Sequence, residues 1–106
     1  MVKNLFDAIP EKLEQEAFNS LLEHNAVKIE RIVSEGHISP ESGWYDQDLH
    51  EWVLIIQGEG HLEFEDERIE KMKAGDHLNI PARVKHKVCW TDPNQKTIWL
   101  AVFYQD

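Results

Sequence analysis

Gly43–Gly60 reads GWYDQDLHEWVLIIQGEG and contains the features that decide the fold. A polar cluster leads directly into the apolar run Trp52–Ile56, and a glycine pair, Gly58 and Gly60, then allows the chain to turn back. Carboxylate and imidazole side chains therefore stand at the entrance of a predicted buried strand. Polar groups placed in this way beside an apolar core are typical of a metal or small-ligand site.

The composition indicates one acidic domain. The chain has 106 residues, of which 42% are hydrophobic, and this is enough to fill one core. Its formal net charge of −9 argues against nucleic acid as a partner, because phosphate binding requires a basic face. A single cysteine, Cys89, excludes an internal disulfide and favours a reducing compartment. No apolar run approaches the roughly 20 residues of a membrane helix, and the N-terminus has no signal-peptide core. We therefore expect a cytoplasmic protein without a membrane partner.

Residues 1–26 are predicted to form a helical strap. Pro10 suits the first turn of a helix. Four apolar residues then share one helical face: Leu13, Ala17, Leu21 and Leu22. One amphipathic helix of about 14 residues is too short to be a domain, so we expect it to pack on the outside of the rest of the chain.

Residues 27–106 are predicted to form an all-β domain. From Val27–Val33 to Thr97–Tyr104, short segments rich in β-branched and aromatic residues are separated by turn signals, about 8–12 residues apart. A loop is expected over residues 34–43, where a proline and two glycines gather. This pattern favours an antiparallel sandwich or barrel of about eight strands.

Two spaced motifs in this region resemble those of the cupin superfamily. The first cupin motif is G-x5-H-x-H-x3-4-E-x6-G, and Glu51 and Gly58 match its second half. The second is G-x5-P-x-G-x2-H-x3-N, and Gly75, Pro81 and His86 match it in order and spacing. The piece GDHLNIPARVKH is similar to the form common in small bacterial cupins.

The resemblance implies a double-stranded β-helix, or jelly roll, with a pocket at the open end of the barrel. It also implies a divalent transition metal held by two histidines and the glutamate of the first motif and by the histidine of the second. Iron, nickel, zinc and manganese are the candidates, and no organic cofactor is implied. Glu51 and His86 stand at two of the four ligand positions. In the second motif, Arg83 replaces the glycine and Trp90 the asparagine.

The histidine pair of the first motif is replaced. Its positions are Tyr45 and Gln47 with a three-residue spacer, and Trp44 and Asp46 with a four-residue spacer. Alternation along a strand puts Tyr45, Gln47 and Glu51 on one face, which favours the shorter spacer. Gln47 is then a candidate weak ligand, and Tyr45 is expected to line the substrate pocket, although a packed rim aromatic is an equal alternative.

His86 lies between two lysines on a predicted strand, so its side chain is expected to face inward. By the same alternation Trp90 shares this face, and we expect it to line the substrate pocket. His50 is adjacent to Glu51 and points out of the barrel unless the strand contains a bulge. With a bulge, His50, Glu51 and His86 would form the two-histidine, one-carboxylate set of non-haem iron sites. Without it, His50 faces solvent or a second subunit.

These residues support two alternative functions. In the first, Glu51 and His86, aided by Gln47 or His50, hold a divalent metal beside a small polar metabolite. The sequence selects no reaction and does not decide whether the protein is an enzyme. In the second, the same pocket binds or senses a small ligand without metal, since the missing histidine pair leaves few strong donors. The outward side chains of the Trp52–Ile56 run further predict a homodimer, because apolar residues on both faces of a strand need cover.

Overall fold

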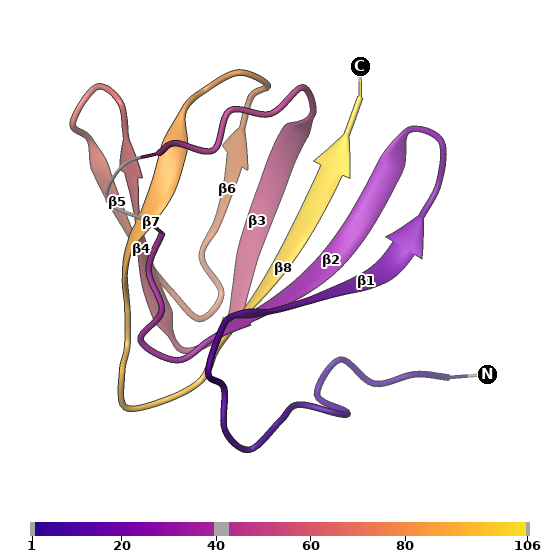
Figure 1. Cartoon of the computed structure of the whole chain (residues 1–106). Helices are drawn as coiled ribbons and strands as arrows, with labels where there is room; N and C mark the ends of the chain where they lie inside the picture. Colours follow the sequence, from indigo (N-terminus) through magenta and orange to yellow (C-terminus); the bar gives the residue numbers. More distant parts are fainter. Residues whose placement is uncertain (1, 40–42, 106) are drawn as a thin grey trace.

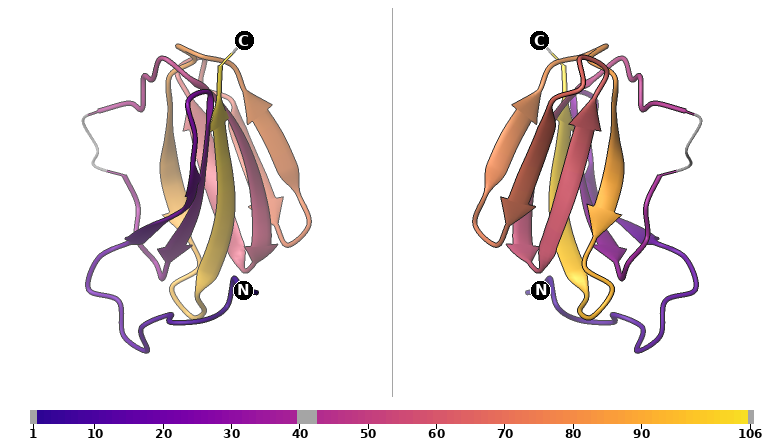
Figure 2. Two further views of the ribbon diagram at one scale, coloured as in Figure 1. Left: turned by 90° about the vertical axis from the view of Figure 1, so that its right-hand side faces the viewer. Right: turned by 90° about the vertical axis from the view of Figure 1, so that its left-hand side faces the viewer.

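Two antiparallel sheets form the molecule (Figure 1). The structure, a computed structural model, describes residues 2–39 and 43–105. The larger sheet has the strand order β1-β2-β8-β3-β6 and the smaller one β5-β4-β7. The strands are β1 (Ala17–Glu23), β2 (Val27–Ser34), β3 (His50–Gln57), β4 (Glu59–Phe64), β5 (Ile69–Lys73), β6 (His77–Ile80), β7 (His86–Thr91) and β8 (Thr97–Tyr104). Figure 2 shows the two sheets as facing layers, with residues 2–16 running outside them. This is the all-β jelly roll that the motifs predict.

The core lies between the two sheets and results from strand alternation. Alternate residues are buried from Glu51 to Ile55 in β3 and from Gly60 to Phe64 in β4, so each strand contributes one row of residues to the interior. The core cluster consists of Val53, Ile55, Leu62, Phe64, Met72, Ile80 and Trp99. Burying such side chains contributes about 1.5–3 kcal/mol each to folding.

Gly60 in β4 is the point where the indole of Trp99 packs against the opposite sheet. A Cβ atom at position 60 would lie 2.2 Å from Cζ2 of Trp99, which no real contact allows. The missing side chain at Gly60 therefore makes room for the largest residue of the core, and this fixes the position of Trp99.

The predicted N-terminal helix is wrong. The described residues contain no helix, and Ala17–Glu23 is the edge strand β1, paired antiparallel with β2. Leu21 and Leu22, which were to form part of a helical face, are 46% and 50% exposed. A helix of this length is only marginally stable in water, whereas the open edge of β2 offers a full row of backbone hydrogen bonds. The β1–β2 hairpin spans the expected domain boundary between residues 26 and 27.

The loop predicted over 34–43 agrees with the structure only in part. Ser34 ends β2, and no regular element occupies residues 35–39. Residues 40–42 lie outside the described part of the chain.

Arg31 attaches the N-terminal segment to the larger sheet. Its side chain is 5% exposed, and Nη1 donates to the carbonyl oxygens of Leu5 (2.8 Å) and Asp7 (2.7 Å). Nη2 donates to Oδ1 of Asn19 in β1 (2.8 Å). One buried guanidinium thus joins the N-terminal segment, β1 and β2. Across residues 2–39 and 43–105, we find no helix with the length and apolarity needed to cross a membrane.

Candidate functional site

Glu51 enters the barrel interior from the start of β3. It is 9% exposed, and it lies on the same face of β3 as the core residues Val53 and Ile55. Its neighbours on either side, β6 and β8, pair with it along the backbone, so its direction is set by the sheet. A carboxylate in this position is costly unless it is hydrogen-bonded.

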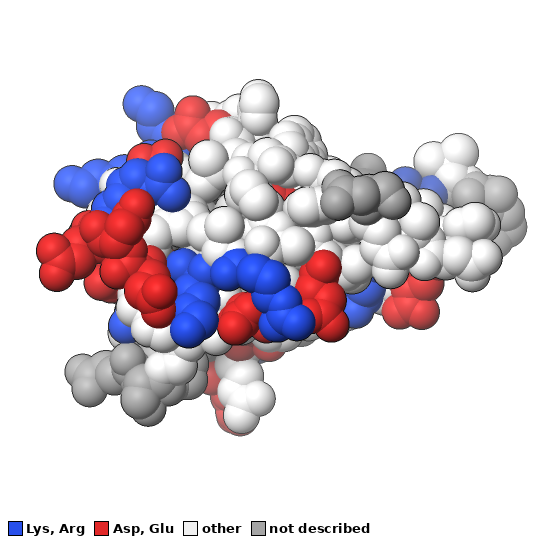
Figure 3. All heavy atoms as spheres, turned by 90° about the horizontal axis from the view of Figure 1, so that it is seen from above, with Lys and Arg blue, Asp and Glu red and all other residues white. Residues whose placement is uncertain are grey.

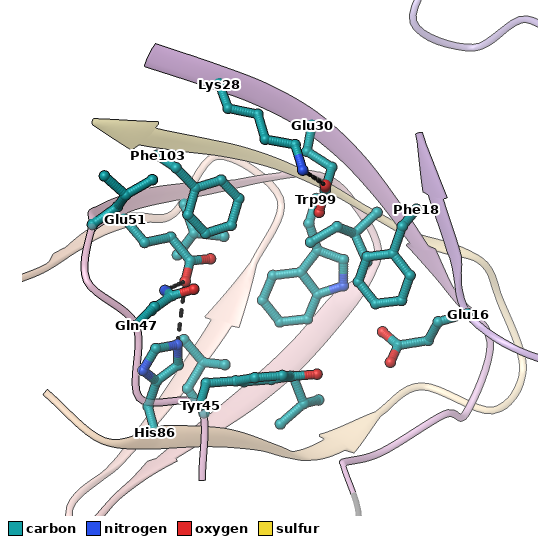
Figure 4. A pocket seen from close by; sticks show the side chains of 15 residues that line it. Glu16, Phe18, Lys28, Glu30, Tyr45, Gln47, Glu51, His86, Trp99 and Phe103 are labelled. Carbon is teal, nitrogen blue, oxygen red and sulfur yellow. Dashed lines mark hydrogen bonds and ion pairs between the residues drawn. The ribbon is translucent and has the colours of Figure 1, made fainter. Parts of the chain in front are cut away.

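Two polar side chains satisfy the same oxygen of Glu51 (Figure 4). Nε2 of Gln47 donates to Oε1 of Glu51 at 2.7 Å. Nε2 of His86 lies 3.2 Å from the same atom. These three residues form a polar cluster, which we call the Gln47–Glu51–His86 cluster, at one end of the interior.

Backbone pairing holds the segment that carries Gln47 in place. Tyr45 and His86 exchange two hydrogen bonds, from Tyr45 N to His86 O (2.7 Å) and from His86 N to Tyr45 O (3.2 Å). Arg83 N donates to Gln47 O at 2.9 Å, and its guanidinium pairs with Asp46 (3.3 Å) and Asp48 (2.5 Å). Figure 3, which views this end of the barrel, shows acidic and basic side chains mixed together, with no continuous patch of one sign.

His86 is protonated on Nδ1 because of its backbone partner. The Val84 carbonyl, 2.9 Å from Nδ1, can only accept a hydrogen bond, so Nδ1 donates. Nε2 then faces the Glu51 carboxylate. Burial lowers the pKa of His86, but the hydrogen bonds to Glu51 and Val84 and the Glu51 charge outweigh it, and the pKa is raised above its ordinary value of 6.5. The cluster can therefore hold and exchange a proton near neutral pH.

The cluster borders a cavity of about 360 Å³. Aromatic side chains supply much of its wall, namely Phe18, Tyr45, Trp99 and Phe103. Aliphatic residues complete it: Ile32, Val53, Leu62 and Val88 from the two sheets, and Leu49 from the segment directly before β3. A mostly apolar chamber with a few converging polar groups is the usual form of a small-molecule site.

Strands β1 and β2, with the residue directly before β1, bring four further residues to the cavity that sequence reasoning missed: Glu16, Phe18, Lys28 and Glu30. Glu16 and Phe18 were missed because this segment was predicted to be helical. Lys28 and Glu30, which pair at 3.2 Å, share one face of β2 with Ile32. Alternation along Val27–Ser34 was the signal that could have found them.

Two predicted site residues do not line the cavity. His50 is on the outer face of β3, where its Nδ1 accepts a hydrogen bond from Ala82 N (2.9 Å) and its ring lies 5.0 Å from that of Tyr104. Trp90 packs on His61, with 4.5 Å between ring centroids. The cause is a bulge in β7, where Val88 pairs with Leu62 but Trp90 pairs with His61. The extra residue, Cys89, reverses the alternation that would turn Trp90 inward.

Comparisons with known proteins agree with this architecture. A family model described as the cupin domain matches residues 31–103, which is more than half of the chain. The chain belongs to the cupin family. A candidate mannose-6-phosphate isomerase from Ralstonia eutropha JMP134 is similar over 100% of this cupin and 99% of its own chain, with 41% identity and a TM-score of 0.94.

More distant structures share the fold alone. A cupin superfamily protein from Desulfitobacterium hafniense DCB-2 has 19% identity and a TM-score of 0.76, over 92% of this chain and 84% of that one. The polyketide cyclase RemF from Streptomyces resistomycificus has 17% identity and a TM-score of 0.72, over 88% and 67%. A search of curated proteins gives no match.

The metal site implied by the cupin motifs is incomplete in this chain's own residues. Within residues 2–39 and 43–105, no three His, Cys, Asp or Glu side chains gather in a way that could hold a metal ion. Glu51 and His86 are two strong donors, and Gln47 and Tyr45 are weaker ones. Tight transition-metal sites usually need three or four strong protein donors. The residues therefore do not fit a metal centre built by the protein alone.

Proposed function

We propose that this cupin binds a small organic molecule in its barrel cavity and that the Gln47–Glu51–His86 cluster holds a polar group of that molecule. The observation that carries the proposal is the position of the Glu51–His86 pair. Both residues are at least nine-tenths buried, and both line a chamber otherwise walled mainly by aromatic and aliphatic side chains. Replacing a buried charged pair by apolar residues often stabilises a protein, so retaining one is better explained by a ligand than by folding.

The cluster offers a ligand both donors and an acceptor. The raised pKa of His86 favours the ring form that carries a proton on Nε2, and Glu51 presents a second carboxylate oxygen beside it. A hydroxyl or carbonyl group of the ligand can be bound here. The name of the Ralstonia relative indicates a sugar isomerase, and an isomerisation needs a group that takes up and returns a proton. The Glu51–His86 pair supports that chemistry.

A divalent ion is the second candidate, and the orientation of His86 favours it. Histidines that bind metals commonly donate their other ring nitrogen to a backbone carbonyl, as Nδ1 does here to Val84. Glu51 and His86 would be the protein ligands, and the bound molecule would have to supply further donors. Such an ion would polarise an oxygen atom of the ligand.

A fragment screen by thermal shift and NMR tests the main proposal. We expect fragments to shift resonances of cavity residues, and we expect His86→Ala and Glu51→Gln to lower their affinity by about tenfold or more. His50→Ala is the matched control, since this histidine lies outside the cavity. Equal binding to all variants, or no binding in a broad screen, would contradict the proposal.

Metal analysis separates the two candidates. Protein purified without chelator, and then soaked in iron, nickel, zinc or manganese with and without bound fragments, is measured for metal content. The metal-free function predicts no stoichiometric metal in either state. Metal retained only with a fragment, and lost in His86→Ala but not in His50→Ala, would favour the second candidate.

A further inference from the structure

Trp99 presents a buried hydrogen-bond donor that has no partner. The side chain is 3% exposed and lines the cavity. Among the described residues, its Nε1 is one of two buried side-chain nitrogen or oxygen atoms without a hydrogen bond, the other being Nε of Arg31. An indole N–H can only donate, so it calls for an acceptor atom. Figure 4 shows this nitrogen on the side of the ring that faces Phe18 and Glu16, away from the Gln47–Glu51–His86 cluster.

Glu16 supplies an acceptor to the same part of the cavity. Its Oε2 accepts a hydrogen bond from Oγ of Ser34 at 2.7 Å, which fixes the carboxylate beside the cavity wall. Within the described residues, its Oε1 has no hydrogen bond or ion pair. The other two carboxylates of the cavity each have a basic partner, because Glu30 pairs with Lys28 and Glu51 with His86, whereas among the described residues Glu16 has none.

The indole N–H of Trp99 needs an acceptor, and the carboxylate of Glu16 needs a donor. A ligand group that serves both must accept one hydrogen bond and donate another. A hydroxyl group can accept from Trp99 and donate to Glu16 at once. An ammonium group has no acceptor for the indole, and a carboxylate or phosphate would be repelled by Glu16. Of the chemical groups compared, the hydroxyl satisfies both side chains.

The charges around the cavity point to the same class of ligand. Three carboxylates line it, against one lysine and one histidine that are each paired with one of them. This balance disfavours an anion. The aromatic faces of Trp99, Phe18 and Phe103 suit the C–H faces of a ring, and hydroxyl groups at both ends of the ligand would meet the two polar regions.

We infer that Glu16 and Trp99 form a second polar subsite, which binds a hydroxyl group, and that the ligand is an uncharged polyhydroxylated molecule such as a sugar or polyol. This inference rests on the proposed function, since it concerns the other end of the same cavity. Glu16 and Trp99 lie outside both motifs of the family, so the subsite comes from this chain's own residues.

The indole N–H resonances provide a direct test. The four tryptophans give four such signals in a ¹H–¹⁵N spectrum, and Trp99→Phe assigns one of them. The probes are D-mannose, D-glucose and sorbitol, with D-glucosamine as the cationic and D-gluconate as the anionic counterpart. We expect at least one neutral probe to move the Trp99 signal downfield, as a new hydrogen bond would, and to bind more tightly than its charged counterparts.

Glu16→Gln tests the carboxylate without removing its side chain. Its amide oxygen can still accept from Ser34, so the fold is expected to persist, and affinity for the neutral probe should fall about tenfold. Glu14→Gln, an exposed neighbour, is the control and should bind as the unchanged protein does. If Trp99→Phe fails to fold, Glu16→Gln and the charged probes still decide the question.

Three results would overturn the inference: no movement of the Trp99 signal with any neutral probe, tighter binding of glucosamine or gluconate, or unchanged affinity in Glu16→Gln. Each is distinct from failure of the proposed function. If the fragment screen finds His86-dependent binding while the neutral sugars do not bind, the cavity is a ligand site but the hydroxyl subsite is wrong. If no fragment binds at all, both are wrong.

Discussion

Protonation of the His86 ring is coupled to the stability of the fold. The two ring nitrogens face a carbonyl and a carboxylate, 2.9 Å and 3.2 Å away, and both partners favour the doubly protonated ring. Because the pKa is raised above 6.5 in the folded protein, the interaction stabilises the fold fully below about pH 6.5. The stabilisation is lost as the pH rises through the folded pKa.

The first prediction is therefore that the free energy of unfolding declines on the alkaline side of pH 6.5 and that Glu51→Gln flattens this decline. Urea denaturation over a pH series measures the decline, and NMR titration of the His86 ring measures the pKa. His50→Ala is the control, because this histidine does not face Glu51. A folded-state pKa for His86 below 6.5 would contradict this coupling.

Gly60 gives a second prediction at the same scale. A methyl group at this position would meet Cζ2 and Cη2 of Trp99 at 2.2 Å and 2.5 Å, so Gly60→Ala must displace the indole. We expect a loss of about 1–3 kcal/mol in the free energy of unfolding, together with weaker ligand binding. Urea denaturation and tryptophan fluorescence measure the two effects. Gly75→Ala is the comparison, because it adds backbone strain but no atom lies within 4 Å of its Cβ. Unchanged tryptophan fluorescence in both variants would contradict the prediction.

Arg83 shows what a family pattern can and cannot say about one residue. The second cupin motif has glycine at this position, and the structure has a positive φ of 70° there, a conformation that glycine adopts without strain. The motif in the sequence marks residue 83 as a position where the family has glycine, but it does not show that Arg83 itself adopts the positive φ. Arg83 retains this angle while its backbone holds Gln47 and its side chain pairs with two exposed aspartates.

At the scale of the elements, one side chain of β2, Arg31, joins β1 and the segment before it to the larger sheet. Arg31→Met removes three charge-assisted hydrogen bonds, two to the N-terminal segment and one to Asn19. We expect about 2–4 kcal/mol of destabilisation and faster proteolysis before residue 17. Lys71→Met on the exposed side of β5 is the control. Proteolysis at the rate of the unchanged protein would show that Arg31 does not hold the segment.

Two elements show why sequence alone could not complete the site. β1 has helical spacing of its leucines, yet pairing with β2 decides its conformation, and that pairing is a tertiary effect outside the local pattern. In β7, no residue type in the sequence signals the bulge at Cys89. Simple alternation therefore predicted that Trp90 faces the interior, which is wrong. Glu51 and His86 were found because each precedes any irregularity in its own strand.

At the scale of the whole molecule, most of the barrel can be predicted from local pattern. Alternating burial in β3 and β4 and turns between short apolar runs predict two facing sheets, and the spaced motifs predict the jelly roll. The cavity could not be predicted in the same way. Its far wall comes from Glu16, Phe18, Lys28 and Glu30, whose contribution depends on how β1 and β2 close over the interior.

The expected homodimer stays a prediction. The strand register aligns Ile29, Val102 and Trp52 in one row across the outer face of the larger sheet, and all three are partly exposed. We expect light scattering to give twice the chain mass of 12.4 kDa and Trp52→Lys to give a monomer. Glu67→Lys, in an exposed turn, is the control. A monomeric mass for the unchanged protein would contradict this expectation.

The edge position of β1 has a kinetic consequence. Two residues of the hydroxyl-binding end lie at the edge of the larger sheet, since Phe18 belongs to β1, which has only β2 as a sheet neighbour, and Glu16 immediately precedes β1. This wall can therefore detach without breaking the barrel. Amide hydrogens of β1 should therefore exchange with solvent through local opening, far more often than those of β8 at the centre of the sheet. A bound molecule would slow that exchange selectively, and its residence time would be set by the opening of one hairpin and not by the global stability of the protein.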